Sequence, residues 1–139
     1  MKTPVIPLGL LLIAGAANAN DEVVVIASGA LPKVDLPTLQ RLYTGRIVSV
    51  GQQAATPLNL SAGDPLRKRF LEGVLGQTEE QYTGYWLVRR YVGKGAPPQE
   101  FATVDEMLRQ LASTPGAVAY VPVSKVPSGA NIIYRAGGK

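Results

Sequence analysis

One stretch, residues 36–70, most constrains the fold of this chain, because it passes from a helix through a turn and a strand into a second helix. The first helix is expected to end in Thr44-Gly45-Arg46, since glycine suits the left-handed residue that follows a helix. A strand is expected around Pro57 to Leu60, and Asp64-Pro65 then supplies an N-cap and a first helical residue. Turns that lead a strand into a helix N-terminus build anion sites in α/β folds, because free backbone N–H groups point outward there. The stretch therefore predicts an α/β fold and a place for an anion.

Buried runs and capped amphipathic helices alternate along the rest of the chain. Val23 to Ala27 reads VVVIA, which is typical of a strand covered on both faces. Further strands are expected at Ala117 to Val121 and at Asn131 to Arg135, the last of them at a sheet edge. Residues 47–50 are expected to form a short strand or an extended turn. Helices are expected to begin near Asp35, Asp64, Thr78 and Thr103. This alternation predicts a single α/β domain with a mixed central sheet flanked by helices.

The helix that follows Thr78 is expected to be well packed. Thr78 and Gln81 have the spacing of a capping box, and so do Thr103 and Glu106 further along. The residues that follow at helical spacing are Tyr82, Tyr85, Trp86 and Arg89. Such an aromatic stripe is more typical of a core than of a ligand platform. Gly84 is unfavourable inside a helix and indicates close helix packing.

Residues 1–19 have the features of a signal peptide. Lys2 gives a positive start, Val5 to Ala17 is mostly apolar, and Ala17-Asn18-Ala19 supplies the small residues that a signal peptidase reads. The apolar run is shorter than the roughly 20 residues that a transmembrane helix needs. We therefore expect cleavage after Ala19, a periplasmic location, and a domain of residues 20–139 without a membrane span.

Composition argues against catalysis and against nucleic acid. The chain contains no histidine and no cysteine, so the usual metal ligands, thiol nucleophiles and the commonest general base are absent, and no cofactor is expected. Without Lys2 the chain has 13 Lys and Arg against 10 Asp and Glu, a mild excess. The clusters Arg67-Lys68-Arg69 and Arg89-Arg90 do not form one basic face, because successive helical residues point about 100° apart. Both are expected to be solvated helix surface, and the protein is expected not to be an enzyme.

Three runs occur in an order that resembles a known family. They are LYTGRIVSV (42–50), PLNLSAGDPLRKRF (57–70) and TPGAVAYVP (114–122). In this order they resemble the substrate-binding proteins of phosphate ABC transporters, and more closely short secreted proteins of the periplasmic-binding-protein-like superfamily, over roughly Val23 to Val123. The resemblance implies one lobe of the type II periplasmic-binding-protein fold, a small anion such as phosphate as ligand, and a membrane transporter as partner. The implied ligand contacts are Thr44, Gly45 and Arg46 at one turn and Ser61, Gly63, Asp64 and Arg67 at the other.

The anion site implied by the resemblance is degenerate in this chain. Aligned on Phe70, the family's Ser-Gly-Thr falls on Asp64-Pro65-Leu66, and its arginine falls on Leu60. A carboxylate about 4 Å from a bound anion repels it by roughly 1 to 4 kcal/mol, depending on the local dielectric. Proline removes one N–H donor. Arg67, one turn into the helix, is the residue placed to replace part of the missing charge.

Two functions therefore remain open at this point. The first is an exported, phosphate-receptor-like solute-binding protein of an ABC-transporter type family, with a degenerate anion site. The second is a non-catalytic periplasmic interaction or scaffold module that kept the fold and lost ligand binding. Such a module is expected to dock with another periplasmic protein through the vacant cleft edge or the exposed side of the last strand.

Overall fold

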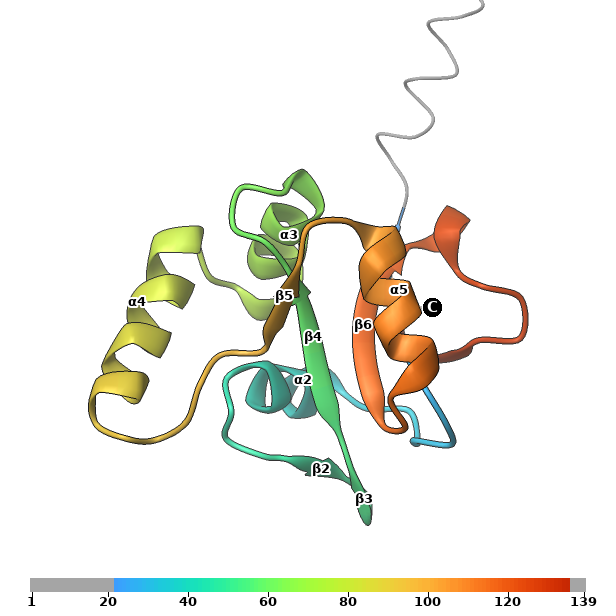
Figure 1. The fold of residues 1–139 in the computed structure, drawn as a ribbon, viewed down its shortest axis with the longest axis horizontal. Coiled ribbons are helices and arrows are strands. Elements are labelled where there is room, and N and C mark those ends of the chain that lie inside the picture. The colour runs from blue at the N-terminus through green and yellow to red at the C-terminus, as the bar shows by residue number, and fades with distance from the viewer. Residues whose placement is uncertain (1–21, 136–139) are drawn as a thin grey trace, which may run out of the picture.

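A five-stranded mixed sheet forms the centre of the protein (Figure 1). The computed structural model describes residues 22–135, so the expected signal peptide and its cleavage after Ala19 lie outside the described residues. In spatial order the strands are β5 (Gln99–Phe101), β4 (Thr56–Leu60), β6 (Ala117–Pro122), β1 (Val23–Ala27) and β7 (Asn131–Arg135). Strand β4 runs parallel to β5 and β6, whereas β1 runs antiparallel to β6 and β7. The predicted mixed sheet is confirmed, and β7 lies at an edge as expected.

The four main helices begin at the residues predicted as caps. They are α2 (Leu36–Tyr43), α3 (Pro65–Phe70), α4 (Glu79–Tyr91) and α5 (Val104–Ser113). The caps Asp35, Asp64, Thr78 and Thr103 each accept a backbone N–H from the first turn. The capping box of Thr78 is complete. That of Thr103 differs, because the Glu106 carboxylate accepts from the backbone N–H of Ala102. After α3 the chain continues as a π-helical turn, η1 (Leu71–Leu75), and stops at Gly76 with φ +70°.

The helices cover the sheet unevenly. Figure 1 shows α5 on one face and α2 on the other, while α4 stands outside the β5 edge. Strand β1 is completely buried, as its VVVIA sequence predicts. Beside β4, Phe70 stacks on Tyr120 with ring centroids 4.0 Å apart, and the Tyr43 ring meets Phe70 edge-on at 4.8 Å. Trp86 is buried too, so the prediction that the aromatic stripe belongs to the core is confirmed for that residue.

Two features differ from the sequence-based expectation. Strand β5 was not predicted from the sequence, whereas the short strand expected within residues 47–50 is present as β2 (Ser49–Val50), which pairs with β3 (Gln53–Ala54). Gly84 was expected to mark close packing, but a Cβ built there meets no atom within 4 Å. That expectation is wrong for contacts within the described chain, since the helix passes no neighbour at this position. Within residues 22–135, no helix has the length and apolar character needed to cross a membrane.

Candidate functional site

The first predicted turn, Thr44-Gly45-Arg46, follows α2 and packs against α4. The Thr44 hydroxyl donates to the carbonyl of Gln40 (2.7 Å), and the Thr44 carbonyl accepts from the Tyr85 hydroxyl (2.7 Å). The Arg46 guanidinium lies over the Tyr85 ring, 5.7 Å from its centroid. These groups are used to attach the end of one helix to the side of another. Their contacts account for the turn without a ligand.

Gly45 has a structural role at this turn, which a substitution can test. It has φ +74°, and a Cβ placed there would collide with the Trp86 ring. Gly45→Ala should therefore cost about 2 kcal/mol of unfolding free energy, the left-handed strain plus displacement of a packed ring. Gly129→Ala is the matched control, because Gly129 has φ +77° and open space around it. Urea denaturation should show a clearly smaller loss of unfolding free energy for the control. Equal losses would mean that the Trp86 ring moves aside without a measurable cost.

The second predicted turn follows β4. The Ser61 hydroxyl donates to the Phe101 carbonyl (3.2 Å), which also accepts the Ser61 backbone N–H (2.9 Å). The Asp64 carboxylate accepts the N–H of Leu66 (2.8 Å), so it caps α3 as predicted. Gly63 has φ +95° with open space around its Cα. This turn therefore presents a carboxylate and a bare stretch of backbone, while its hydroxyl already has an acceptor.

The two turns do not converge on one cavity. Gly45 lines a cavity of about 250 Å³ together with Thr56 and Pro57, at the start of β4. Ser61 follows Leu60, the last residue of that strand. Four residues of extended chain separate the two ends by roughly 13 Å. Thr44 and Arg46 line a different cavity, and Arg67 a third, so the predicted contact residues are dispersed.

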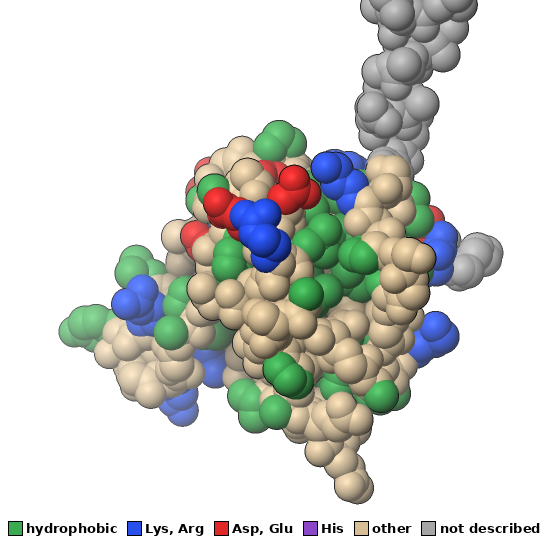
Figure 2. Space-filling model, turned by 45° about the vertical axis from the view of Figure 1, so that its right-hand side comes forward, with side chains coloured by type: hydrophobic (Ala, Val, Ile, Leu, Met, Phe, Trp, Pro, Cys, Tyr) green, Lys and Arg blue, Asp and Glu red, His purple; other side chains and the backbone are tan. Residues whose placement is uncertain are grey.

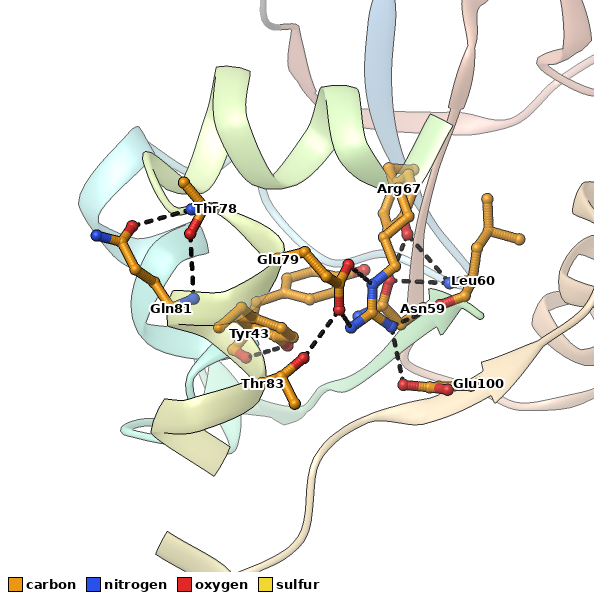
Figure 3. A network of polar contacts seen from close by, with 11 residues as sticks. Tyr43, Asn59, Leu60, Arg67, Thr78, Glu79, Gln81, Thr83 and Glu100 are labelled. Carbon is orange, nitrogen blue, oxygen red and sulfur yellow. Dashed lines mark hydrogen bonds and ion pairs between the residues drawn. The ribbon is translucent and has the colours of Figure 1, made fainter. Parts of the chain in front are cut away.

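Arg67 is the most heavily bonded residue of the candidate site (Figure 3). Its Nε and Nη2 donate to the two carboxylate oxygens of Glu79 at 2.9 and 2.7 Å. Its Nη1 donates to Glu100 and to the carbonyl of Leu60, both at 2.8 Å. The guanidinium also lies over the Tyr82 ring, 5.6 Å from its centroid. One arginine thus joins the end of β4 to α4 and to the edge strand β5.

Arg67 is not solvated helix surface, and that expectation is wrong for it. Its side chain is only 3 % exposed, whereas the neighbouring Lys68 and Arg69 are exposed as expected. Burial alone disfavours the charge, but the hydrogen bonds and charges of Glu79 and Glu100 outweigh it and raise the pKa of Arg67 above its ordinary value. The residue is permanently cationic, and its charge is balanced inside the protein.

Strand order indicates a candidate ligand-binding edge of the sheet at the end of β4. The chain leaves β4 for β5 on one side and then returns through α5 to β6 on the other side. In open α/β sheets, ligands bind outside the carboxyl ends of the strands where the order reverses in this way. Here that edge consists of the loop after β4, with Ser61, Gly63 and Asp64, and the segment Val123–Lys125 after β6. We refer to these two segments together as the switch-point edge.

Sequence reasoning missed the β6 part of the switch-point edge. Val123–Lys125 forms a short 3-10 turn, and Lys125 is exposed there. Nothing in the local sequence marks this turn, because its proximity to Ser61 follows from the parallel pairing of β4 with β6. Leu60, aligned with the family's arginine, is fully buried, so its side chain faces the core and not this edge. Among the described residues, no group of three or more His, Cys, Asp or Glu side chains is placed to hold a metal ion.

Comparison with known proteins identifies the fold. No family model matches the chain, and no curated protein matches it. Several solved structures do, among them the following three. An ABC-type phosphate transport receptor from Vibrio cholerae has a TM-score of 0.62, 16 % identity, and coverage of 81 % of this chain and 45 % of its own. A Clostridium perfringens protein with bound phosphate, described as a phosphate ABC transporter substrate-binding protein, has a TM-score of 0.66, 16 % identity, and coverage of 86 % and 46 %. PstS from Borrelia burgdorferi has a TM-score of 0.59, 13 % identity, and coverage of 82 % and 47 %.

These similarities define the class of fold. The chain has a type II periplasmic-binding-protein-like α/β fold, as the sequence resemblance implied. It spans about half the length of the phosphate receptors it matches, which corresponds to one lobe. At 13 to 16 % identity, the likeness establishes the fold and leaves the ligand to be argued from the residues themselves.

Proposed function

We propose that this protein is an exported, non-catalytic binding module that docks with another periplasmic protein and does not capture free phosphate by itself. The observation that carries the proposal is Arg67, whose N–H groups face two carboxylates and a carbonyl. Charge-assisted hydrogen bonds are the main source of affinity for a small anion, and protein acceptors already engage four of the five N–H groups of this guanidinium. The receptor-like fold supports a binding role, and the features of residues 1–19 support export.

The remaining groups of the switch-point edge also disfavour an anion. The Ser61 hydroxyl is occupied by Phe101, and the Asp64 carboxylate adds negative charge where the family places hydroxyls. A single lobe leaves the ligand open to water, which weakens each electrostatic contact further.

Titration with phosphate tests this function directly. The wild-type protein should show no saturable phosphate binding below millimolar concentrations, by calorimetry or by amide chemical shifts. Asp64→Asn keeps the cap of α3 but removes the charge, so it should bind phosphate weakly, near roughly −4 kcal/mol. The shifts should map to the switch-point edge. Micromolar binding by the wild type would refute the proposal, and an unresponsive Asp64→Asn would show that this carboxylate is not what blocks the edge.

A second candidate function is solute capture as part of an ABC transport system. It is favoured by the exposed Lys125 and by the open backbone at Gly63, both on the switch-point edge. In this case the missing half of the cleft comes from a partner, and the ligand is a solute other than free phosphate. Calorimetry with sulfate and small organic acids distinguishes the two functions. Micromolar affinity for one of these would favour capture, whereas a periplasmic partner retained without added solute would favour the docking module.

A further inference from the structure

Helix α4 is apolar on two opposite sides. One side faces the protein and buries Tyr82 and Trp86. On the other side Leu87, Val88 and Tyr91 are 69 %, 63 % and 90 % exposed. A helix that is hydrophobic all round is normally covered all round. Figure 2 shows hydrophobic side chains on the projecting left-hand part of the surface, where α4 lies away from the body of the protein.

The exposed side of α4 has the spacing of a helix–helix interface. Gly84, Leu87, Val88 and Tyr91 occur at i, i+3, i+4 and i+7, which places them on one stripe. We call these four residues the outer stripe. Apart from its chain neighbours and the backbone of its own helix, no atom of the described chain lies within 4 Å of a Cβ added at Gly84, so the stripe contains a notch about two helical turns before its bulkiest member, Tyr91. Glycine destabilises the interior of a helix, and Gly84 gains no close packing within the described chain in compensation. A partner side chain packed in the notch would explain why a glycine is present.

The charges along α4 identify that partner as a second copy of the same helix. The exposed charge of the first turn is Glu80, and the end of the helix has the exposed basic residues Arg90 and then Lys94, whereas Glu79 and Arg89 face the protein. Two copies packed antiparallel bring the acidic end of one beside the basic end of the other and oppose their helix dipoles. A parallel arrangement would bring like charges together. The pattern is therefore self-complementary, as an isologous two-fold interface requires.

We propose that the protein forms a two-fold dimer through the outer stripe of α4, with the helices antiparallel and Tyr91 of each copy seated in the Gly84 notch of the other. This register pairs residues whose numbers sum to about 175, so it places Leu87 beside Val88 at the centre. It also places Glu80 next to the C-terminal end of the partner helix, where Lys94 follows in the turn. Both Glu80 and Lys94 are exposed in the single chain, so they are accessible for this contact. The inference is independent of the proposed function, because α4 lies outside the switch-point edge.

The size of the outer stripe sets the expected strength of the dimer. A tyrosine contributes roughly 150 to 250 Å² when it is buried, and a standard stable interface needs about 800 Å² from each partner. Three large apolar residues supply roughly half of that area, and the flanking charged side chains add to it. We therefore expect a reversible dimer with a dissociation constant in the micromolar range, on the order of 1 to 100 μM.

Sedimentation equilibrium of the purified protein, from roughly 1 μM to 1 mM, tests the dimer. Leu87→Asp should raise the dissociation constant at least about 100-fold, since it puts a charge at the centre of the interface. Val48→Asp makes the same chemical change at a residue that is 75 % exposed on the chain before β2, and it should leave the dimer intact. Because Leu87 is largely exposed, circular dichroism should show that its variant keeps the fold.

A charge swap tests the antiparallel register. Glu80→Lys should weaken the dimer about 5- to 10-fold by placing like charges together, and Lys94→Glu should do the same. The double variant should recover wild-type affinity, because each swapped pair is again opposite in sign. A protein that stays monomeric up to millimolar concentration would overturn the dimer. A dimer insensitive to Leu87→Asp would overturn its location, and a double variant that stays weak would overturn the register.

Discussion

Glu79→Ala should lower the free energy of unfolding by about 3 to 5 kcal/mol, because it leaves the buried Arg67 guanidinium without its bidentate partner. Arg67 is 3 % exposed and cannot recover hydration without leaving its site beneath Tyr82. Glu100 remains, but it contacts only Nη1. The loss should persist at high salt, since a buried pair is screened far less than a surface pair. Urea unfolding at low and high ionic strength measures both effects.

Removing the other member of the pair should cost less. In Arg67→Met the stem volume stays filled, while Glu79 and Glu100, whose side chains are 32 % and 43 % exposed, turn to water. We expect a loss of about 1 to 2 kcal/mol, much of it from the Leu60 carbonyl that loses its donor. Glu79→Gln is the matched control, because it keeps a hydrogen-bond acceptor and removes only the charge. If Arg67→Met proves more damaging than Glu79→Ala, burial of the arginine charge is not what makes this network sensitive.

The helix starts were predictable because their causes are local. A cap is decided by residues within three positions of one another, as with Thr78 and Gln81, whose side-chain and backbone bonds the structure contains in full. The buried strand β1 was predictable for a similar reason, since five consecutive apolar residues allow few other environments. Where the deciding residues lie next to each other in sequence, pattern and structure agree.

The features that were missed depend on residues far apart in the chain. Strand β5 has three residues, Gln99–Phe101, two of them polar, and it exists because it pairs with β4 about forty residues earlier. The burial of Arg67 depends on Glu79 and Glu100, which follow it by 12 and 33 positions. Its basic neighbours made the segment look like solvated surface. No local pattern distinguishes an arginine that will meet two carboxylates from one that will meet water.

The candidate site shows the same limit. Each predicted turn exists where the sequence placed it, with Gly45 at φ +74° and Asp64 capping α3. Whether two turns form one site depends on the length and direction of the strand between them, and β4 carries them apart. The switch-point edge likewise depends on strand order, which brings Lys125 into consideration. Which of these residues contact a ligand stays a prediction.

Three buried tyrosines should make the protein unfold at alkaline pH. Burial raises the pKa of Tyr82 to about 12, and burial raises the pKa values of Tyr43 and Tyr120 as well. Each hydroxyl also donates to an oxygen that would repel a phenolate: Tyr43 to the Leu58 carbonyl, Tyr82 to the Tyr43 carbonyl, and Tyr120 to the Asn59 side chain. The native state therefore holds these three protons more tightly than the unfolded chain does.

The sign of the effect follows from proton linkage. Below pH 10, the ordinary tyrosine pKa, both states are protonated and the stabilisation is complete. As the pH rises through 10 toward 12, the unfolded chain releases protons that the native protein keeps, so unfolding becomes more favourable. Each such tyrosine contributes about 1.4 kcal/mol per pH unit, and three together approach roughly 4 kcal/mol per pH unit.

Urea unfolding at stepped pH from neutral to about 11, with phenolate absorbance followed in parallel, measures this slope. Tyr82→Phe should reduce the slope by about one third, although it also lowers stability at neutral pH by removing the bond to the Tyr43 carbonyl. Tyr134→Phe, on the edge strand β7 and outside the outer stripe of α4, is the control and should keep the wild-type slope. Stability that stays constant up to pH 11, with phenolate appearing before unfolding, would mean that water reaches these rings in the native state.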